Sequence, residues 1–481
     1  MKNHVNRREF LELTLAGGAL CLAGSGRFSF AADAAGIKLI SPGCRTSKVK
    51  VARLDIGGTT NSSLWPKPHL DFKDEIRFYE SHFAKMQSEL SDVDFAVDEL
   101  VVSQGKIAQM KDKLADVDGI LVIHLNMGLG SILRDIVKCG KPTMIFAAPY
   151  SGHEWTDFGS LRKQSNVECL LTADYTQLAP AIRPFRAIHH LKNAKICNLT
   201  TNNFTDYGAQ MKDKFGTEIK MIPLDRMLKL YDSVPDADAK AEADRWIKGA
   251  EKVVEPPKEE IIKSCRLALA FEKLLDEEQA TAMTVDCYGS MYRPLCKTYA
   301  FPCIGFTRLN DMGLGGICES DLRSAMTHII FQGLSGKPGF ISDPTVDEST
   351  NSIILAHCLG SRKMDGPSGE MSPYKIRTIM ERQEGAVTQV QMRKGQKVTQ
   401  AILIGTDLMP YFTGEIVDTP VGIEVDRGCR TKITVKVDGD AEKLWQNWSN
   451  GLHRVTCYGN VAKDLQRFCK FKSIKMVNEA V

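Results

Sequence analysis

Strands and helices alternate along most of this chain, and this alternation restricts its fold more than any other feature. Between residues 37 and 345, short apolar runs typical of buried strands are separated by segments with helical periodicity. Strand and helix following one another at this interval predict a parallel sheet with helices on both faces. The predicted strands are 49–54, 95–102, 119–123, 142–148, 194–199, 218–222 and 282–287. The predicted helices are 75–90, 107–114, 131–139, 177–191, 207–215, 236–254 and 259–275.

The pattern changes after about residue 346. Strand-like runs linked by glycine turns then dominate, and a helix at 463–471 follows them. The predicted strands of this part are 351–357, 386–393, 397–404, 421–425 and 431–437. We therefore predict an α/β fold with two parallel-sheet domains, at 37–173 and 174–345, and a mainly antiparallel, β-rich C-terminal domain at 346–481.

The amino end carries the signature of an exported protein. Arg7 and Arg8 precede Phe10, a mild apolar run covers residues 13–22, and small residues suited to cleavage follow. We expect residues 1–36 to be a twin-arginine signal peptide that is read by the Tat translocase. The alternative is an ordinary amphipathic helix. Because the apolar run is too short to span a bilayer, the mature protein is expected to be soluble and periplasmic or otherwise exported.

Charge and cysteine spacing exclude several classes of function. The net charge is +3, with no block of Lys and Arg, so we expect no nucleic-acid partner. The chain has 14 cysteines but no Cys-x-x-Cys pair, which indicates neither a zinc ribbon nor a disulfide lattice. Most of these thiols are expected to be small buried core residues.

Two carboxylates and an imidazole in the last third are candidate metal ligands. Glu319, Asp343 and His453 each lie at the edge of a glycine-marked segment. Two carboxylates on one divalent ion also suit proton transfer between adjacent carbons of a sugar. The alternative is that each is a surface or capping residue, since their spacing matches no compact motif. Glu319 precedes a predicted helix that Gly333 is expected to terminate.

A second candidate region follows the predicted strand at 142–148. His153 and Trp155 lie just after this strand, where α/β domains place ligand contacts, and the Trp155 ring is suited to stacking on a sugar face. A structural role for His153 is the alternative. Gly128 and Gly130 resemble half of a dinucleotide loop, but a turn before a helix explains them as well.

The C-terminal half resembles the L-fucose isomerase and L-arabinose isomerase superfamily. The resemblance is clear over about residues 280–481 and weaker, mostly architectural, over 37–280. The segments that carry it are Gly316–Asp321 with Ala325 and Thr327, Ile341–Pro344, Asn351–Cys358, and Leu452–Asn460 leading into Asp464 and Leu465.

This resemblance implies a fold, a metal and a reaction. Members are aldose–ketose isomerases with two Rossmann-like domains and a β-barrel-like C-terminal domain, and they bind manganese or a similar divalent ion. They assemble as trimers or hexamers with the site between subunits. Position by position, Glu319, Asp343 and His453 match the metal ligands, and His357 matches the fourth ligand of the arabinose branch. Glu319 and Asp343 are then expected to share proton transfer through an enediol.

The substrate and the class of function stay open at this point. Arg454 directly follows His453, and such a cation suits an acidic group, so the expected substrate is a monosaccharide or a sugar acid. The leading hypothesis is an exported isomerase or epimerase. One alternative is an exported sugar-binding protein without catalysis, and another is a metal-binding homologue that has lost isomerisation.

Overall fold

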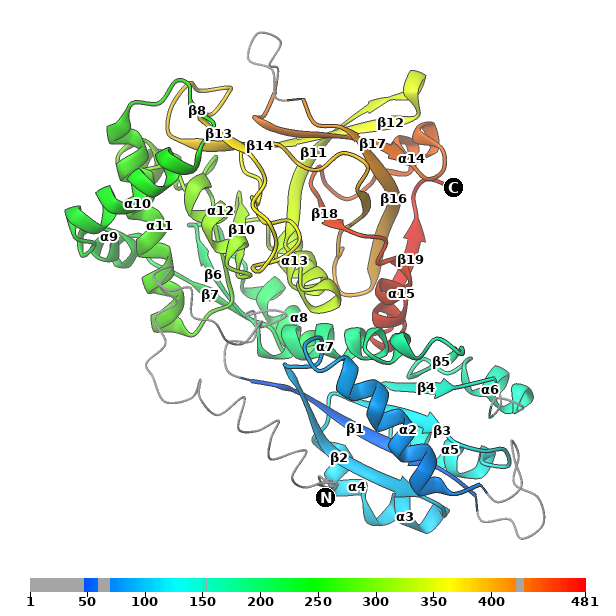
Figure 1. Ribbon diagram of the computed structural model, residues 1–481. Helices are drawn as coiled ribbons and strands as arrows, with labels where there is room; N and C mark the ends of the chain where they lie inside the picture. The colour runs from blue at the N-terminus through cyan, green and yellow to red at the C-terminus, as the bar shows by residue number, and fades with distance from the viewer. Residues whose placement is uncertain (1–46, 59–69, 150, 152–153, 421–427) are drawn as a thin grey trace, which may run out of the picture.

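The computed structural model describes residues 47–58, 70–149, 151, 154–420 and 428–481 (Figure 1). The predicted signal peptide at 1–36, His153 and the predicted strand at 421–425 lie outside these residues. The described chain contains two parallel sheets with helices and a mainly antiparallel, barrel-like C-terminal region, which confirms the predicted fold class. In the described part, no helix has both the length and the apolar character needed to cross a membrane.

The first sheet is parallel and buried on both faces. Its strand order is β2-β1-β3-β4-β5, and every residue of β3 is buried. The strands are β1 (Val49–Ile56), β2 (Val93–Val101), β3 (Gly119–His124), β4 (Thr143–Ala147) and β5 (Val167–Leu171). The helices are α2 (Phe72–Lys85), α3 (Gln104–Gln109), α4 (Lys111–Ala115), α5 (Gly130–Lys138) and α6 (Trp155–Leu161). Helix α2 packs in one apolar cluster and α3 to α6 pack in another, so helices cover both faces of this sheet.

The second sheet is also parallel, in the order β10-β9-β6-β7. Its strands are β6 (Lys195–Leu199), β7 (Glu218–Met221), β9 (Ala282–Val285) and β10 (Gly315–Cys318). The helices around it are α7 (Arg183–Asn193), α8 (Thr205–Phe215), α9 (Leu224–Asp232), α10 (Asp236–Gly249), α11 (Lys258–Glu278), α12 (Cys303–Asp311) and α13 (Leu322–Ser335). Short helical turns cover Tyr175–Leu178, Pro180–Ile182 and Tyr292–Lys297. Helix α7 lies between the first sheet and the rest of the molecule (Figure 1) and packs against α13.

The C-terminal strands close into a barrel. Their order is β15-β18-β11-β12-β17-β16-β19, and a further pairing of β15 with β16 joins the ends of a six-stranded ring. The strands are β11 (Gly339–Asp347), β12 (Ser352–His357), β15 (Lys397–Ala401), β16 (Leu408–Asp418), β17 (Thr431–Val437), β18 (Arg454–Tyr458) and β19 (Lys475–Asn478). Helices α14 (Ala441–Asn447) and α15 (Ala462–Phe471) accompany them. A small sheet joins β8 (Lys252–Val253), β13 (Tyr374–Arg377) and β14 (Val387–Val390).

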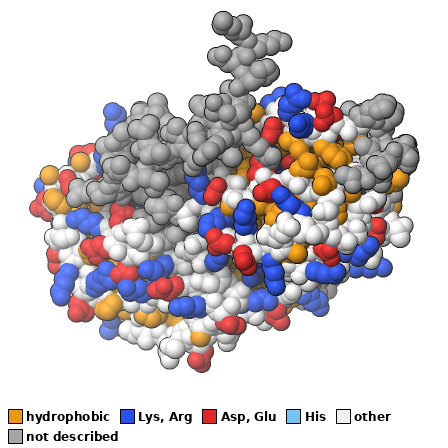
Figure 2. Space-filling model, turned by 90° about the horizontal axis from the view of Figure 1, so that it is seen from below, with side chains coloured by type: hydrophobic (Ala, Val, Ile, Leu, Met, Phe, Trp, Pro, Cys, Tyr) orange, Lys and Arg blue, Asp and Glu red, His pale blue; other side chains and the backbone are white. Residues whose placement is uncertain are grey.

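Several elements differ from the sequence predictions. Helix α13 does not end at Gly333; it continues to Ser335 and ends where Gly336 takes a positive φ of 71°. Gly333 instead faces α7, and a Cβ atom at this position would collide with the backbone of Ala187. The predicted helix at 236–254 ends at Gly249, before strand β8. The elements that were not predicted are strands β5, β10, β11, β13, β16, β18 and β19 and helices α6, α9, α12 and α14. The face seen in Figure 2 mixes Lys and Arg with Asp and Glu side chains, with small apolar areas between them.

Candidate metal centre and active site

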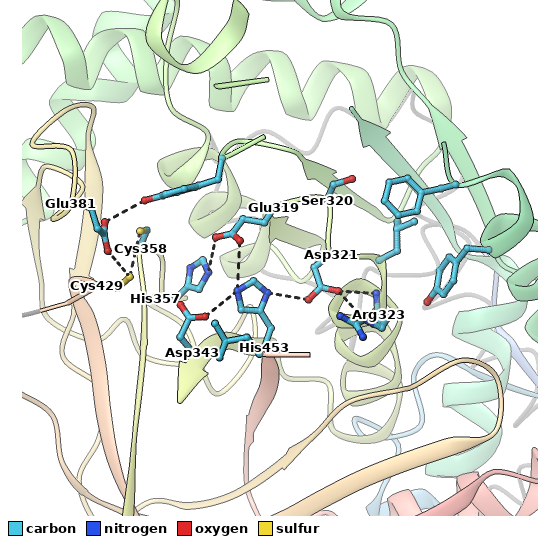
Figure 3. Close-up of a pocket in the computed structure, with 15 residues that line it drawn as sticks. Glu319, Ser320, Asp321, Arg323, Asp343, His357, Cys358, Glu381, Cys429 and His453 are labelled. Atoms are coloured by element: carbon cyan, nitrogen blue, oxygen red, sulfur yellow. Dashed lines mark hydrogen bonds and ion pairs between the residues drawn. The ribbon is translucent and has the colours of Figure 1, made fainter. Parts of the chain in front are cut away.

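The candidate site is a pocket of about 720 Å³ between the second sheet and the barrel. The turn after β10 forms one side of the pocket, and the ends of barrel strands form the other (Figure 3). It is lined by Phe204, Tyr207, Tyr288, Glu319, Ser320, Asp321, Leu322, Arg323, Asp343, His357, Cys358, Glu381, Cys429, Leu452 and His453.

A strained turn presents Glu319. Strand β10 ends one residue before it, and α13 begins three residues after it. Glu319 and Ser320 both take the left-handed conformation, with φ of 63° and 55°. A residue other than glycine pays about 1 kcal/mol or more for this conformation, so the surrounding contacts must hold it. One such contact is the Ser320 hydroxyl, which donates to Oδ1 of Asn198 on β6 at 2.6 Å.

The barrel register gathers the other three candidate ligands. Asp343 on β11 pairs with Ala356 on β12, so His357 at the end of β12 lies next to it. On the other side of β11, Ser342 pairs with Arg454, the first residue of β18. His453 precedes β18 and therefore lies beside Asp343. Three adjacent strands thus deliver residues that are far apart in the sequence.

The structure brings the four predicted ligands together. His453 Nε2 lies 3.2 Å from a carboxylate oxygen of Asp343 and 3.8 Å from one of Glu319. His357 Nε2 lies 3.7 Å from the other oxygen of Glu319. The rings of His357 and His453 are 5.4 Å apart between centroids. Figure 3 shows all four side chains turned toward one another.

Asp321 is a functional candidate that the sequence reasoning missed. Its Oδ2 lies 3.1 Å from Nδ1 of His453, so the other ring nitrogen is turned toward Glu319 and Asp343. A histidine that binds a metal commonly has its second nitrogen fixed by a carboxylate in this way. The signal in the sequence was an acidic residue two positions after Glu319, in the N-cap position of the following helix.

The charges in the site are tightly coupled. Burial and the nearby carboxylates of Asp343 and Asp321 raise the pKa of Glu319. Burial disfavours a charge on His453, but hydrogen bonds with Asp321 and Asp343 outweigh it and raise the pKa of His453 to about 10. Burial and the neighbouring His453 lower the pKa of His357 to about 4. The site therefore concentrates negative charge that a cation would offset.

The donor set fits a hard or borderline divalent ion. Glu319, His357 and His453 each offer a ligand atom within 4.8 Å of the others, and Asp343 adds a carboxylate next to His453. Carboxylates together with imidazoles suit manganese and similar ions, which prefer oxygen and nitrogen ligands. The fixed orientation of His453 adds to this fit.

Arg454 does not lie in the pocket. Its side chain is 1% exposed, its guanidinium donates to Glu479 at 3.1 Å and to the Ser449 carbonyl at 2.8 Å, and it covers the Trp448 ring. Successive side chains on a strand point to opposite faces, so Arg454 points away from the side to which His453 points. The cation that lines the pocket is Arg323, on the first turn of α13.

Trp155 also lies apart from this pocket. It begins α6 beside the first sheet and is 72% exposed. The preceding Glu154 contacts His124 at 2.6 Å and accepts a hydrogen bond from the backbone N–H of Gly128 at 2.7 Å. The glycine turn after β3 is therefore held by a carboxylate of this chain.

Comparison with known proteins gives two similar enzymes. No family model matches the chain. The sulfoquinovose isomerase of Clostridium sp. (strain MSTE9) is 24% identical over 305 residues, which cover 58% of this chain and 63% of that protein. The sulfoquinovose isomerase of Alkalicoccus urumqiensis is 25% identical over 162 residues, which cover 32% of this chain and 34% of that protein. The chain thus spans less than two thirds of each relative, and both relatives are named as sugar isomerases.

Proposed function

We propose that this protein is a metal-dependent aldose–ketose isomerase that acts on a monosaccharide or a sugar acid. The observation that carries the proposal is the meeting of Glu319, Asp343, His357 and His453 in one pocket, although they come from four separate segments. The two relatives named sulfoquinovose isomerase support the same class of reaction.

Glu319, Asp343, His357 and His453 would hold manganese or another divalent ion. When bound, the ion supplies positive charge that polarises the sugar carbonyl and makes the adjacent C–H more acidic. The side chains of Glu319 and Asp343 remain about one third exposed, at 32% and 33%, so their carboxylates are open to a molecule in the pocket. These two carboxylates share the work of taking a proton from one carbon and returning it to the next. Asp321 keeps His453 in the orientation that this arrangement needs.

The pocket also suits a sugar that carries a negative group. Arg323 lines it, with one guanidinium nitrogen donating to the Asn450 carbonyl at 2.6 Å. Phe204, Tyr207 and Tyr288 supply aromatic faces on which a sugar ring can pack. Both relatives are named for sulfoquinovose, and the sulfo prefix of that name denotes an acidic substituent, which agrees with an anionic substrate. Arg323 therefore replaces Arg454 as the proposed contact for such a group.

We also propose that the protein works after export and as a homo-oligomer. The paired arginines at positions 7 and 8 support export by the Tat translocase, and the resemblance to the fucose and arabinose isomerases supports a trimer or hexamer.

The proposal is tested by measuring metal content and turnover on the same samples. Wild-type protein loaded with manganese should convert at least one aldose or sugar acid to its ketose. Glu319→Gln and Asp343→Asn should each lower kcat by a factor of at least 100, because each removes one proton-carrying oxygen. Asp347→Asn is the matched control, because Asp347 lies on the same strand outside the pocket, so its replacement should leave turnover and metal content unchanged.

Two results would contradict the proposal. Wild-type turnover that persists in Glu319→Gln and Asp343→Asn would remove these residues from catalysis. Tight sugar binding without turnover, in protein that has been loaded with metal, would instead favour the sugar-binding alternative.

A further inference from the structure

A second group of metal-ligating side chains lies in the wall of the same pocket. Cys358 directly follows β12, Cys429 lies two residues before β17, and Glu381 lies between β13 and β14. Because β12 and β17 pair with His357 opposite Thr431, the two cysteines lie at the same end of these strands. The Sγ atoms are 3.8 Å apart, and Cys429 Sγ is 3.3 Å from a Glu381 oxygen (Figure 3).

These distances match the edges of a tetrahedral zinc site. Zinc–sulfur bonds of about 2.3 Å separate two sulfur ligands by about 3.8 Å in a tetrahedron. A carboxylate oxygen at about 2.1 Å from the metal lies about 3.6 Å from each sulfur. The observed separations of 3.8 Å and 3.3 Å are close to both values. All three ligand atoms lie within 4.8 Å of one another, so no large movement is needed to surround one ion.

The surroundings orient the carboxylate and leave one side of the group open. The Tyr288 hydroxyl donates to the second oxygen of Glu381 at 3.2 Å, and Arg382 lies over the Tyr288 ring at 4.8 Å. Such a contact to the non-ligating oxygen is the usual support for a metal-binding carboxylate. Cys358 is only 4% exposed, whereas Glu381 is exposed, and all three residues line the pocket.

We propose that Cys358, Glu381 and Cys429 form a second metal site, which takes a zinc-class divalent ion and keeps one coordination position open toward the pocket. Thiolates select softer ions than the carboxylates and imidazoles around Glu319 do, so the two sites would prefer different metals. Binding would release the two thiol protons. This proposal does not depend on isomerase activity.

A disulfide between the two cysteines is the competing fate of this pair. A disulfide needs a sulfur–sulfur distance of about 2.05 Å, well below the observed 3.8 Å, so the sulfurs would have to move toward each other. Once formed, the bond would remove both sulfur ligands. The experiment therefore uses protein reduced with a phosphine, with its free thiols counted before any metal is added.

Cobalt(II) is the probe, because thiolate ligands give it intense near-ultraviolet charge-transfer absorption that oxygen and nitrogen ligands do not. Reduced wild-type protein should develop this band on titration with cobalt, with an intensity at saturation that corresponds to one thiolate-bound cobalt per chain. Cys358→Ser and Cys429→Ser should each lose most of it, and Glu381→Gln should weaken cobalt binding about tenfold or more. Cys139→Ser, which removes a half-buried thiol at the end of α5, is the matched control and should keep the band.

The Glu319→Gln variant separates this proposal from the proposed function. It should lose turnover but keep the thiolate band, because Glu319 belongs to the other donor set. Absence of the band in fully reduced wild type would overturn the proposal, and so would a band that persists in both cysteine variants. Rapid oxidation that defeats reduction and leaves a Cys358–Cys429 disulfide would also overturn it.

Discussion

Nδ1 of His453 lies 3.1 Å from Oδ2 of Asp321, and the same carboxylate caps helix α13. Its Oδ1 accepts hydrogen bonds from the backbone N–H groups of Arg323 and Ser324 at 3.0 and 3.1 Å. One side chain therefore fixes both the start of the helix and the orientation of a candidate ligand. Asp321 thus connects the first turn of α13 to His453, the residue that precedes β18.

Asp321→Asn should weaken metal binding while leaving the fold intact. Asn is as good an N-cap as Asp, so α13 should keep its start. The amide cannot hold His453 as the carboxylate does, and loss of such a contact commonly costs 10- to 100-fold in metal affinity. A manganese titration monitored by calorimetry measures the change in metal affinity. Unchanged affinity would show that His453 needs no support from Asp321.

Arg323→Gln should discriminate between anionic and neutral sugars. A charge-assisted hydrogen bond to a substrate is worth about 1.5 to 3 kcal/mol, so its loss should raise KM for a sugar acid at least tenfold. KM for a neutral aldose should change little, which makes the neutral sugar the internal control. In Arg323→Lys, KM for the sugar acid should lie between the values of the wild type and of Arg323→Gln, because lysine keeps the charge but lacks the planar guanidinium group. Equal changes for both sugars would remove Arg323 from substrate recognition.

His328 should make the protein less stable in mild acid. It is fully buried on α13, and burial lowers its pKa to about 4 from 6.5. As pH falls below about 6.5, His328 binds a proton in the unfolded chain but stays neutral in the folded protein. The stability that neutral His328 contributes is therefore complete above pH 6.5 and declines toward pH 4. The loss between pH 7 and pH 5 should be about 2 kcal/mol.

His328→Asn should remove that part of the pH dependence. The Asn carbonyl can accept the hydrogen bond that the Gly339 N–H now donates to Nδ1 at 3.1 Å. Urea unfolding at pH 7 and pH 5 measures the free energy of unfolding for both proteins. A difference between the two pH values that is the same in wild type and variant would contradict the assignment to His328.

Gly333→Ala should destabilise the protein, although alanine favours helices. The added methyl group would collide with the Ala187 backbone on α7, and such overpacking costs about 1 to 3 kcal/mol. Gly159→Ala in α6 is the matched control, because its Cβ would meet nothing within 4 Å and the change should stabilise by up to about 1 kcal/mol. Urea unfolding should therefore shift in opposite directions for the two variants.

Replacing Arg7 and Arg8 together by lysine should keep the protein in the cytoplasm. The twin-arginine signature depends on the paired arginines themselves, and lysine keeps their charge. Cell fractionation followed by immunodetection measures where the protein accumulates. Export at the wild-type level would show that another signal directs the chain.

The fold class could be predicted because its causes are local. Strands such as β3 are continuous apolar runs, and the intervening helices keep their own periodicity, so each element is legible by itself. Helix ends were less certain. Gly333 looked like a terminator, yet the glycine is needed there for contact with α7, and the next available glycine, Gly336, ends the helix. Contacts between elements were therefore the information that the sequence pattern lacked.

The candidate site was predictable as a set of residues but not as a geometry. Glu319, Asp343 and His453 were candidates from the residues themselves, the resemblance added His357, and the barrel register explains why the four meet. Asp321 and Arg323 were missed because their roles depend on the turn after β10. Arg454 was misplaced because adjacent residues on a strand face opposite ways, a rule that applies only once the start of β18 is known.

The close approach of α7 and α13 links the pocket to a distant position. A helix is a stiff rod with a rise of about 1.5 Å per residue, so Gly333 lies about 18 Å along α13 from Asp321. Any side chain at position 333 that pushes the two helices apart would tilt α13. Its amino end, with Asp321 and Arg323, would then shift relative to the rest of the pocket. Substitutions on the α7 surface that faces α13 would therefore change substrate preference without altering any residue that lines the pocket. Natural selection can then act on specificity through positions far from the site.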